Sequence, residues 1–428
     1  MTRQGIEAGR VLVVGAGISG LATAIRLHRL GWDTTVIEQA AIPRTGGYFI
    51  ATMGTGQAAA RRLGILEALP DRTPSASSAM LDIDRSGTTR RTLGFFDLPM
   101  DPKPMLMLRG DVEHALFDAL PAGVPVRYET TPLAIEQDPD GVDVTLHNKA
   151  TGTDTIERFD LVVGADGLRS TVRSLIFGPH PSILHRLNYM IAACELPTAP
   201  AGLGSSDGAM FFEPGRSLLV YPFADHPQTV LFSYRTANVD AEFTSRPIDR
   251  IRAVYGPQPY GRLLGDVIDA FGAARTYLFD SVEQPKLDSW HRGRVVLVGD
   301  AAWCPTLYSG MGSASSLAGG ELLGTVFEQC TGTLDMALTE WERRLRPYTD
   351  AYQKIGAQAA GAFTPAGVLG IELRRAVMAA RQWPVTKSLF NMVIRRTPAI
   401  LTRNVDIAAA TQSASDAADV SAGRTTVG

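Results

Sequence analysis

A short glycine-rich stretch constrains the fold more than any other feature of this 428-residue chain. The sequence Gly15-Ala16-Gly17-Ile18-Ser19-Gly20 follows the apolar run 11–14 and precedes residues 21–30, which have a helical pattern. Glycines in such a turn let the backbone approach a pyrophosphate, and the helix N-terminus offers it free N–H groups. A second buried run, 34–37, ends at Glu38, whose carboxylate can bind a ribose. The stretch therefore predicts a βαβ unit that binds a dinucleotide at Gly15, Gly17, Gly20 and Glu38.

Composition excludes several classes of protein. The net charge of -3 provides no basic surface for nucleic acid. No apolar run is long enough to span a bilayer, and no apolar signal segment is visible. Cys194, Cys304 and Cys330 are widely spaced, without a metal-ligand or redox pattern. We expect a cytoplasmic protein, a monomer or homodimer, that binds a small molecule and has no metal, no nucleic-acid partner and no integral membrane segment.

The order of the expected elements predicts an α/β fold. Buried strands and helices alternate to about residue 180, antiparallel strands follow to about 285, and a buried strand at 294–298 precedes long helices. This order indicates a doubly wound, Rossmann-like domain with an inserted antiparallel β-sheet and C-terminal helices. We expect a discontinuous dinucleotide-binding domain of residues 1–80, 98–180 and 286–330. A substrate-binding sheet comprises residues 81–97 and 181–285, and a helical region comprises 331–404. The tail, 405–428, is rich in Ala, Ser, Thr and Asp, and we expect it to be disordered.

Motifs later in the chain distinguish an FAD-binding site from an NAD-binding site. The segment Gly164 to Arg173, GADGLRSTVR, resembles the second motif of the class A flavoprotein monooxygenases, the para-hydroxybenzoate hydroxylase group. Gly299-Asp300-Ala301-Ala302 resembles the third motif, and Gly310-Met311-Gly312 follows at the spacing of that group. Residues 105–120, with Arg109 at their head, resemble the segment that supplies an arginine to the FAD. The resemblance covers about residues 10 to 330 and is specific to the superfamily, not to a substrate.

The resemblance implies a mechanism and a set of site residues. It implies noncovalent FAD that NADH or NADPH reduces, O2 addition at C4a, and transfer of one oxygen from the flavin C4a-hydroperoxide to the substrate. It places Arg109 and Asp166 near the pyrophosphate and ribityl chain, and Asp300 at a ribityl hydroxyl. It places Gly310 and Gly312 near N1 and the C2 carbonyl, where negative charge develops on reduction. No catalytic acid or base is identifiable, because the flavin carries the chemistry.

Three positions leave alternatives open. Arg44 is either a basic residue near the flavin or a solvated loop arginine. Trp303 and Leu307 replace the histidine and proline that the family often has after the third motif, so Trp303 either shapes the substrate pocket or covers the flavin loop from the core. Cys304 is a possible covalent flavin link, but the noncovalent rule of the family favours a small buried thiol.

The substrate prediction depends on the inserted sheet. Its strands are rich in aromatic residues and poor in cations, whereas a small carboxylate would need a bidentate arginine. We therefore expect a large, apolar, aromatic or polycyclic substrate of the kind found in secondary metabolism. The candidate residues are Phe212, Tyr221, Phe223, Phe232, Tyr234, Arg235 and Trp303, although alternation along each strand sends some of them into the core.

Rival functions and one rival surface remain open. On the same fold, a flavin-dependent dehydrogenase or oxidase is the alternative enzyme, and a non-catalytic flavoprotein is the alternative from a different class. The apolar and basic segment 365–403 either packs on the body of the protein with a solvated basic face or lies on a membrane surface.

Overall fold

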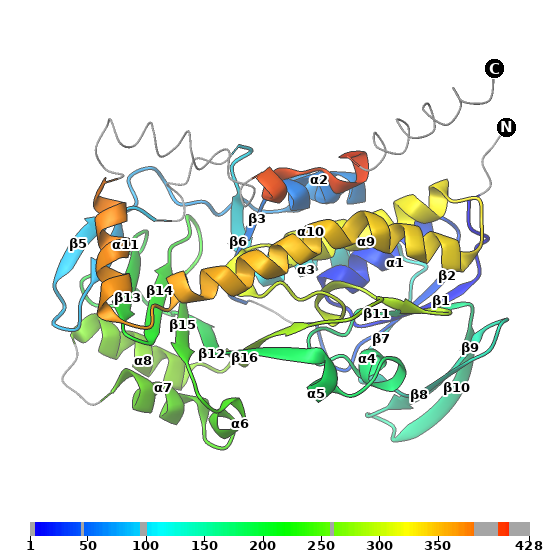
Figure 1. The fold of residues 1–428 in the computed structure, drawn as a ribbon, viewed down its shortest axis with the longest axis horizontal. Helices are drawn as coiled ribbons and strands as arrows, with labels where there is room; N and C mark the ends of the chain where they lie inside the picture. Colours follow the sequence, from blue (N-terminus) through cyan, green and yellow to red (C-terminus); the bar gives the residue numbers. More distant parts are fainter. Residues whose placement is uncertain (1–4, 44–46, 95–100, 257–260, 381–400, 411–428) are drawn as a thin grey trace.

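The computed structural model describes residues 5–43, 47–94, 101–256, 261–380 and 401–410. A mainly parallel sheet, on the right in Figure 1, contains strands β1 Arg10–Val14, β2 Asp33–Ile37, β7 Val126–Arg127, β11 Leu161–Gly164, β17 His291–Arg292 and β18 Val295–Leu297. Their order is β17-β18-β11-β1-β2-β7, and β17 alone among these strands runs antiparallel to its neighbour. Strands β1, β11 and β18 are almost wholly apolar, as expected for parallel strands that are buried on both faces.

Helices cover both faces of this sheet. They are α1 Ile18–Arg29, α2 Gly54–Leu63, α3 Arg109–Asp118, α4 Thr171–Ile176, α9 Gly312–Gln329 and α10 Leu334–Phe363, with the short 3-10 helix η1 Leu66–Ala68 after α2. Helix α9 lies close against α1 because glycines face the contact: a Cβ on Gly320 would lie 2.8 Å from Oγ1 of Thr23. Helix α10 extends along the molecule from the parallel sheet toward the second large sheet (Figure 1).

The second large sheet lies on the left in Figure 1. Its strands are β4 Met80–Ile83, β5 Thr89–Thr92, β12 Leu184–Glu195, β13 Gly208–Glu213, β14 Arg216–Tyr221, β15 Thr229–Arg235 and β16 Leu278–Pro285. They pair in the order β16-β12-β15-β14-β13-β4-β5, mostly antiparallel, with β4 parallel to β13. The hairpin of β4 and β5 therefore joins a sheet whose other strands begin only at Leu184, far later in the chain.

One face of the second sheet is covered by helices that the strand-rich sequence pattern did not predict. They are α6 Val239–Glu242, α7 Pro247–Tyr255 and α8 Arg262–Ala273. Helix α8 buries Leu264, Ile268 and Phe271 against Phe232 and its neighbours on the sheet. The physical reason is that the apolar inner face of a sheet needs a second layer to remove it from water.

Smaller elements complete the described part of the chain. Strands β8 Thr130–Gln137, β9 Val142–Asn148 and β10 Thr153–Phe159 form an antiparallel meander, and β3 Phe49–Thr52 pairs with β6 Met105–Leu108. The remaining helices are α5 His180–Ile183, α11 Val368–Ala380 and the 3-10 helices η3 Gly299–Ala301, η4 Leu307–Ser309 and η5 Thr402–Asn404. The predicted fold class, a doubly wound domain with an inserted sheet and C-terminal helices, is confirmed.

The expectation of a disordered tail from residue 405 is wrong for residues 405–410. Oγ1 of Thr55 donates hydrogen bonds to the carbonyl oxygens of Arg403, at 3.0 Å, and Val405, at 2.8 Å. Ile407 is 2% exposed within the main core, and Asp406 pairs with Arg62 on α2. These contacts offset the entropy lost on ordering the segment, although its composition is polar.

Two sequence-based expectations fall outside the described residues. These are the rest of the predicted tail, 411–428, and most of the basic segment, 381–400. In the described part of the chain, no helix is long and apolar enough to cross a membrane. The described start of the basic segment packs on the second sheet, where Ile371 is buried and Arg375 pairs with Asp82 on β4.

Candidate functional site

Two cavities lie at the carboxyl edge of the parallel sheet. The first, of about 450 Å³, is lined by residues from β1, β2, α3 and the turn after β11, including Gly15, Gly17, Glu38, Arg109 and Asp166. The second, of about 410 Å³, lies between the two large sheets and is lined by Asp300, Gly310 and Gly312 among others. The turn 166–168 borders both cavities, because Asp166 and Gly167 line the first and Leu168 lines the second. Both volumes are in the range of small-molecule and cofactor sites.

The three glycines of the first turn are required for three different reasons. Gly15 has φ +107°, a conformation that side chains other than glycine rarely adopt. A Cβ on Gly20 would lie 1.9 Å from the carbonyl oxygen of Gly15, so glycine here lets α1 pack against β1. A Cβ on Gly17 would meet only Arg109 and Glu113 atoms, at 3.8 Å, and would point into the first cavity. Gly17 therefore keeps space for a ligand, whereas Gly15 and Gly20 maintain the fold.

Glu38 and Asp166 line the first cavity, and both carboxylates also bond the backbone. Glu38 accepts hydrogen bonds from the backbone N–H of Ala16, at 3.0 Å, and of Ala40, at 2.9 Å. Asp166 accepts from the N–H of Thr171, at 2.6 Å, and of Val172, at 3.0 Å, at the start of α4. Burial raises the pKa of Asp166, and these hydrogen bonds oppose the rise. The geometry thus gives Asp166 a structural task at the N-terminus of α4 beside the cavity.

Arg109 lines the first cavity and Asp300 lines the second. Arg109 begins α3, its Nη1 lies 2.9 Å from Oε1 of Glu113, and its N–H donates to the carbonyl oxygen of Tyr48, at 3.1 Å. Asp300 follows β18 in η3 and faces the second cavity. Burial raises the pKa of Asp300, and the positive charge of Arg109 partly opposes this effect. The pair can therefore hold polar groups of a ligand that passes from one cavity to the other.

The loop before α9 forms one wall of the second cavity. Gly310 has φ +67°, and a Cβ on Gly312 would meet no atom within 4 Å. Helix α9 begins at Gly312, and the first N–H groups of a helix have no acceptor within it. The loop and the helix end therefore present donors and a positive dipole end to this cavity.

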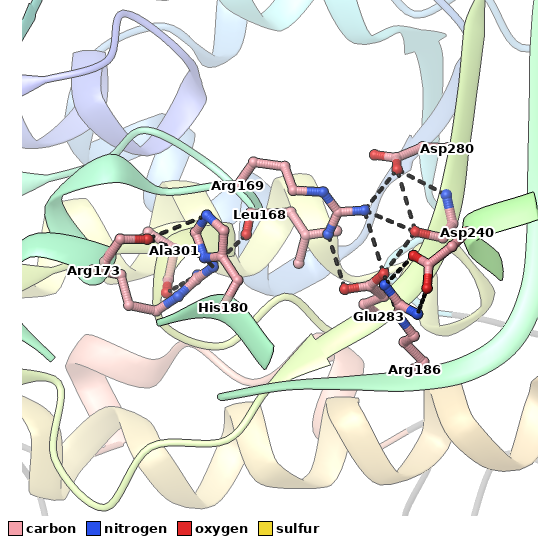
Figure 2. Close-up of polar contacts among 11 residues, drawn as sticks. Leu168, Arg169, Arg173, His180, Arg186, Asp240, Asp280, Glu283 and Ala301 are labelled. Carbon is pink, nitrogen blue, oxygen red and sulfur yellow. Dashed lines mark hydrogen bonds and ion pairs between the residues drawn. The ribbon is translucent and has the colours of Figure 1, made fainter. Parts of the chain in front are cut away.

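Arg169 of the second motif pairs with the second sheet, and Arg173 of the same motif bonds the third motif (Figure 2). Arg169 pairs with Asp280, at 3.0 Å, and Glu283, at 2.9 Å, on β16 of the second sheet. The wholly buried Arg173 donates to the carbonyl oxygen of Ala301, at 2.8 Å, next to Asp300. Sequence reasoning assigned no role to these arginines. The structure shows that they fix the second sheet and the third motif relative to the turn that separates the cavities.

Among the residues predicted to bind substrate, the structure brings Tyr221 to the second cavity. Phe232 and Tyr234 face the other side of the sheet, in the core under α7 and α8, where the Tyr234 hydroxyl donates to Glu242 at 2.8 Å. Phe212 lies under the guanidinium of Arg374 on α11, at 4.1 Å from ring centroid to Cζ. The division follows strand alternation, since Tyr221 and Phe212 share one face of the sheet and Phe232 and Tyr234 the other.

The other predicted substrate residues also lie away from the cavity lining. Phe223 packs near Phe49, with ring centroids 6.1 Å apart. The guanidinium of Arg235 stacks on the ring of Tyr189, and its Nε donates to the carbonyl oxygen of Thr364. Leu307, noted in the sequence as a replacement of the family proline, lines the cavity. Residues that the sequence did not single out for the substrate site line it as well: Tyr48, Phe49, Ile191, Leu231, Leu278, Phe363 and Arg403. Arg44 lies outside the described residues.

Trp303 lies in the main core. It is 1% exposed, and its ring centroid is 5.0 Å from that of Trp290 and 6.1 Å from that of Trp341. Its Nε1 donates to Oγ of Ser315 on α9, at 3.1 Å. Of the two interpretations of Trp303, the structure therefore supports the core residue behind the flavin loop. Its neighbour Cys304 does line the second cavity, and burial raises the pKa of its thiol well above the ordinary value, which disfavours a reactive thiolate.

Comparison with known proteins identifies the family. Residues 9–330 match the model of a family described as FAD binding domain. The chain belongs to this FAD-binding family. The matched range agrees with the extent of the resemblance that the motifs indicated.

Individual relatives agree with the family. A flavin-dependent monooxygenase from an unknown prokaryotic organism is 26% identical over 83% of this chain and 89% of its own. A 3-amino-4-hydroxybenzoate 2-monooxygenase from Streptomyces platensis is 30% identical over 74% of this chain and 79% of its own. The crystal structure of tetracycline destructase Tet(51) matches with a TM-score of 0.70 and 26% identity, over 83% of this chain and 92% of its own. The predicted superfamily and the predicted enzyme class, an FAD-dependent monooxygenase, are confirmed.

If Glu38 binds the ribose of FAD, as the sequence predicts, the Glu38→Ala variant should bind FAD about tenfold more weakly or worse, because it would lose charge-assisted hydrogen bonds of about 1.5–3 kcal/mol each. The ratio of activity with NADH to activity with NADPH should not change, because in this assignment Glu38 binds FAD and does not contact the nicotinamide cofactor. FAD dissociation constants and initial rates with both nicotinamides check this. Unchanged FAD affinity together with a switched nicotinamide preference would show that Glu38 binds a different nucleotide.

Proposed function

We propose that this protein uses NADH or NADPH and O2 to insert one oxygen atom into a sizeable, largely apolar, ring-containing small molecule, such as a natural-product intermediate. The observation that carries this proposal is the meeting of the two cavities at 166–168. The first has the glycine turn and the acidic residue of a dinucleotide site. The second combines a largely apolar wall with a helix N-terminus.

The residues around the cavities fit FAD. The first cavity would hold the adenosine and pyrophosphate at Gly17, Glu38 and the start of α1, where a Cβ on Gly17 would occupy ligand space. Arg109 and Asp300 would hold the middle of the cofactor, and the loop 310–312 would contact the pyrimidine edge of its ring system. When bound, FAD supplies electron transfer and oxygen activation.

The protein's own contribution in the second cavity would be positioning and exclusion of water. Phe49 and Tyr221 stack with centroids 4.0 Å apart and form a flat apolar surface. Leu231, Leu278 and Phe363 extend this surface. Each Å² of apolar substrate surface removed from water contributes about 25 cal/mol, so a large ring system binds here without an ionic clamp.

The acidic side of the cavity wall disfavours a substrate carboxylate at that place, although Arg169 pairs with these acids and Arg403 lines another part of the same cavity. Asp280 and Glu283 line the second cavity beside the apolar residues. Burial raises the pKa of Asp280, and the charge of Arg169 opposes that rise. A carboxylate substrate would approach these acids at a cost in electrostatic energy. Tetracycline, named for one related structure, is a large polycyclic compound and supports this substrate class. The 3-amino-4-hydroxybenzoate named for another relative is a monocyclic aromatic acid, and the experiment below separates the two substrate classes.

We expect polycyclic, mostly apolar phenols to accelerate NAD(P)H oxidation by the FAD-loaded protein more than monocyclic aromatic acids do. The product should gain one oxygen atom, and 18O2 should label it stoichiometrically. The measurements are absorbance of the nicotinamide and product mass. Tight coupling with a monocyclic acid bound at micromolar concentration would contradict the substrate class.

The same experiment separates the rival functions. A dehydrogenase or oxidase on this fold would oxidise its substrate without incorporating 18O. A non-catalytic flavoprotein would bind FAD but would give no substrate-dependent oxidation of NADH or NADPH.

A further inference from the structure

Arg403 is a cavity residue supplied by the C-terminal segment. It lies in η5, far in sequence from the FAD-binding motifs, and it lines the second cavity. Contacts on both sides hold its backbone: Thr55 bonds its carbonyl oxygen, and Asn404 accepts from the N–H of Gly54, at 3.1 Å. The Tyr352 hydroxyl donates to the carbonyl oxygen of Thr402, at 2.7 Å. The guanidinium therefore reaches the cavity from a fixed backbone.

This guanidinium has few partners for a buried cation. Its Nη2 donates to the carbonyl oxygen of Ser309, at 2.8 Å, whereas its buried Nε has no hydrogen-bond partner. In the part of the chain that the structure describes, no carboxylate lies within ion-pairing distance of Arg403. Burial lowers the pKa of Arg403, although an arginine side chain stays protonated in proteins. A partly buried charge without a counter-charge is costly, so a negatively charged ligand group would compensate it.

The position of Arg403 in the cavity indicates which negatively charged ligand group would compensate its charge. Ser309, its hydrogen-bond partner, directly precedes Gly310, and α9 begins at Gly312. The positive end of α9 and the guanidinium therefore act on the same end of the cavity. The acids of this cavity, Asp280 and Glu283, are instead paired with Arg169.

We propose that Arg403 is an electrostatic stabiliser of the reduced cofactor, whose positive charge faces the N1–C2 carbonyl edge of the flavin and favours the two-electron reduced, negatively charged form. This proposal rests on the proposed placement of the flavin against the loop 310–312. Arg403 binds no substrate group in this arrangement. It changes how readily the bound flavin accepts electrons from the nicotinamide.

The test is the reduction potential of the bound flavin in the full-length, FAD-loaded protein. The variants are Arg403→Gln, which removes the charge, Arg403→Lys, which keeps it, and Arg246→Gln, which removes an exposed arginine at the N-cap of α7. At a fixed potential, the ratio of reduced to oxidised flavin should fall about tenfold in Arg403→Gln, which is about 30 mV for a two-electron couple. Arg403→Lys should retain most of the wild-type ratio, and Arg246→Gln all of it.

The outcomes separate this proposal from the proposed function. A wild-type protein that retains no FAD contradicts the proposed function itself. FAD that binds normally to Arg403→Gln with an unchanged potential overturns the role of Arg403, and a simultaneous rise in KM for the ring substrate would assign the arginine to the substrate. If the glutamine variant does not fold, Arg403→Met, which retains the length of the aliphatic chain, provides the neutral variant for the same measurement.

Discussion

The Gly20→Ala variant should be isolated without FAD and with reduced stability. The new Cβ would lie 1.9 Å from the carbonyl oxygen of Gly15 and 3.2 Å from Cβ of Ala165. The closer atom is backbone and cannot rotate away, so α1 must move from β1. Forcing one extra methyl group into a packed core typically costs about 1–3 kcal/mol, and this contact belongs at the upper end of that range. Thermal unfolding of the apoprotein and the flavin content of the purified protein measure the two effects.

Gly17→Ala is the matched control, because the same atom is added three residues away. Its Cβ would meet protein atoms no closer than 3.8 Å and would occupy ligand space. The apoprotein should therefore unfold at the wild-type temperature, while FAD affinity falls. If Gly17→Ala destabilises the apoprotein as much as Gly20→Ala does, or if Gly20→Ala binds FAD normally, the assigned roles of these glycines are wrong.

Trp303→Ala should lower the free energy of unfolding by about 3–5 kcal/mol, the usual cost of deleting a large buried aromatic side chain. The lost contacts are those with Trp290 and Trp341 and the hydrogen bond from Nε1 to Ser315. Denaturant titration of the apoprotein measures this change.

Trp303→Phe provides the comparison for that experiment. Phenylalanine refills most of the volume and loses the hydrogen bond, so its effect should be clearly smaller. A Trp303→Ala variant of normal stability with a changed KM for the ring substrate would contradict the core placement and return Trp303 to the substrate pocket.

The nucleotide half of the protein could be predicted because its signals are local. The glycine turn, Glu38 and Asp300 each follow a short buried strand, and the carboxyl ends of parallel strands meet at one edge of the sheet. Once these strands are recognised, the residues that follow them are expected to lie close together near Gly15 and Gly17. The family resemblance added the expected contacts of Arg109 and the loop 310–312.

The substrate half could not be predicted in the same way. Alternation shows that Leu231 and Phe232 face opposite sides of β15, but not which side carries the cavity, because both sides are apolar. The sequence therefore suggested that Phe232 lines the cavity, whereas in the structure Leu231 lines it. Helix α8, which decides the question by covering the face of Phe232, was hidden in a region dominated by strand signals.

Arg403 could not be found from the sequence for another reason. It belongs to a basic segment whose simplest interpretation was a solvated helix face. Its position depends on the hydrogen bond that Thr55 donates to its carbonyl oxygen and on the one that Asn404 accepts from the N–H of Gly54. Such tertiary contacts leave no periodic pattern. Composition also suggested disorder immediately after it, where Ile407 is in fact buried.

The strand order of the parallel sheet has a consequence for how the chain is made. Strand β1 pairs with β11, and β11 pairs with β18, which a ribosome synthesises much later. Until β18 emerges, β11 presents an unpaired edge, and such edges favour association between incomplete chains. Pairings between residues so distant in sequence also form slowly. Because Arg403 follows β18 in the chain and lines the second cavity, a nascent chain can complete that cavity only after the strands of both large sheets have emerged.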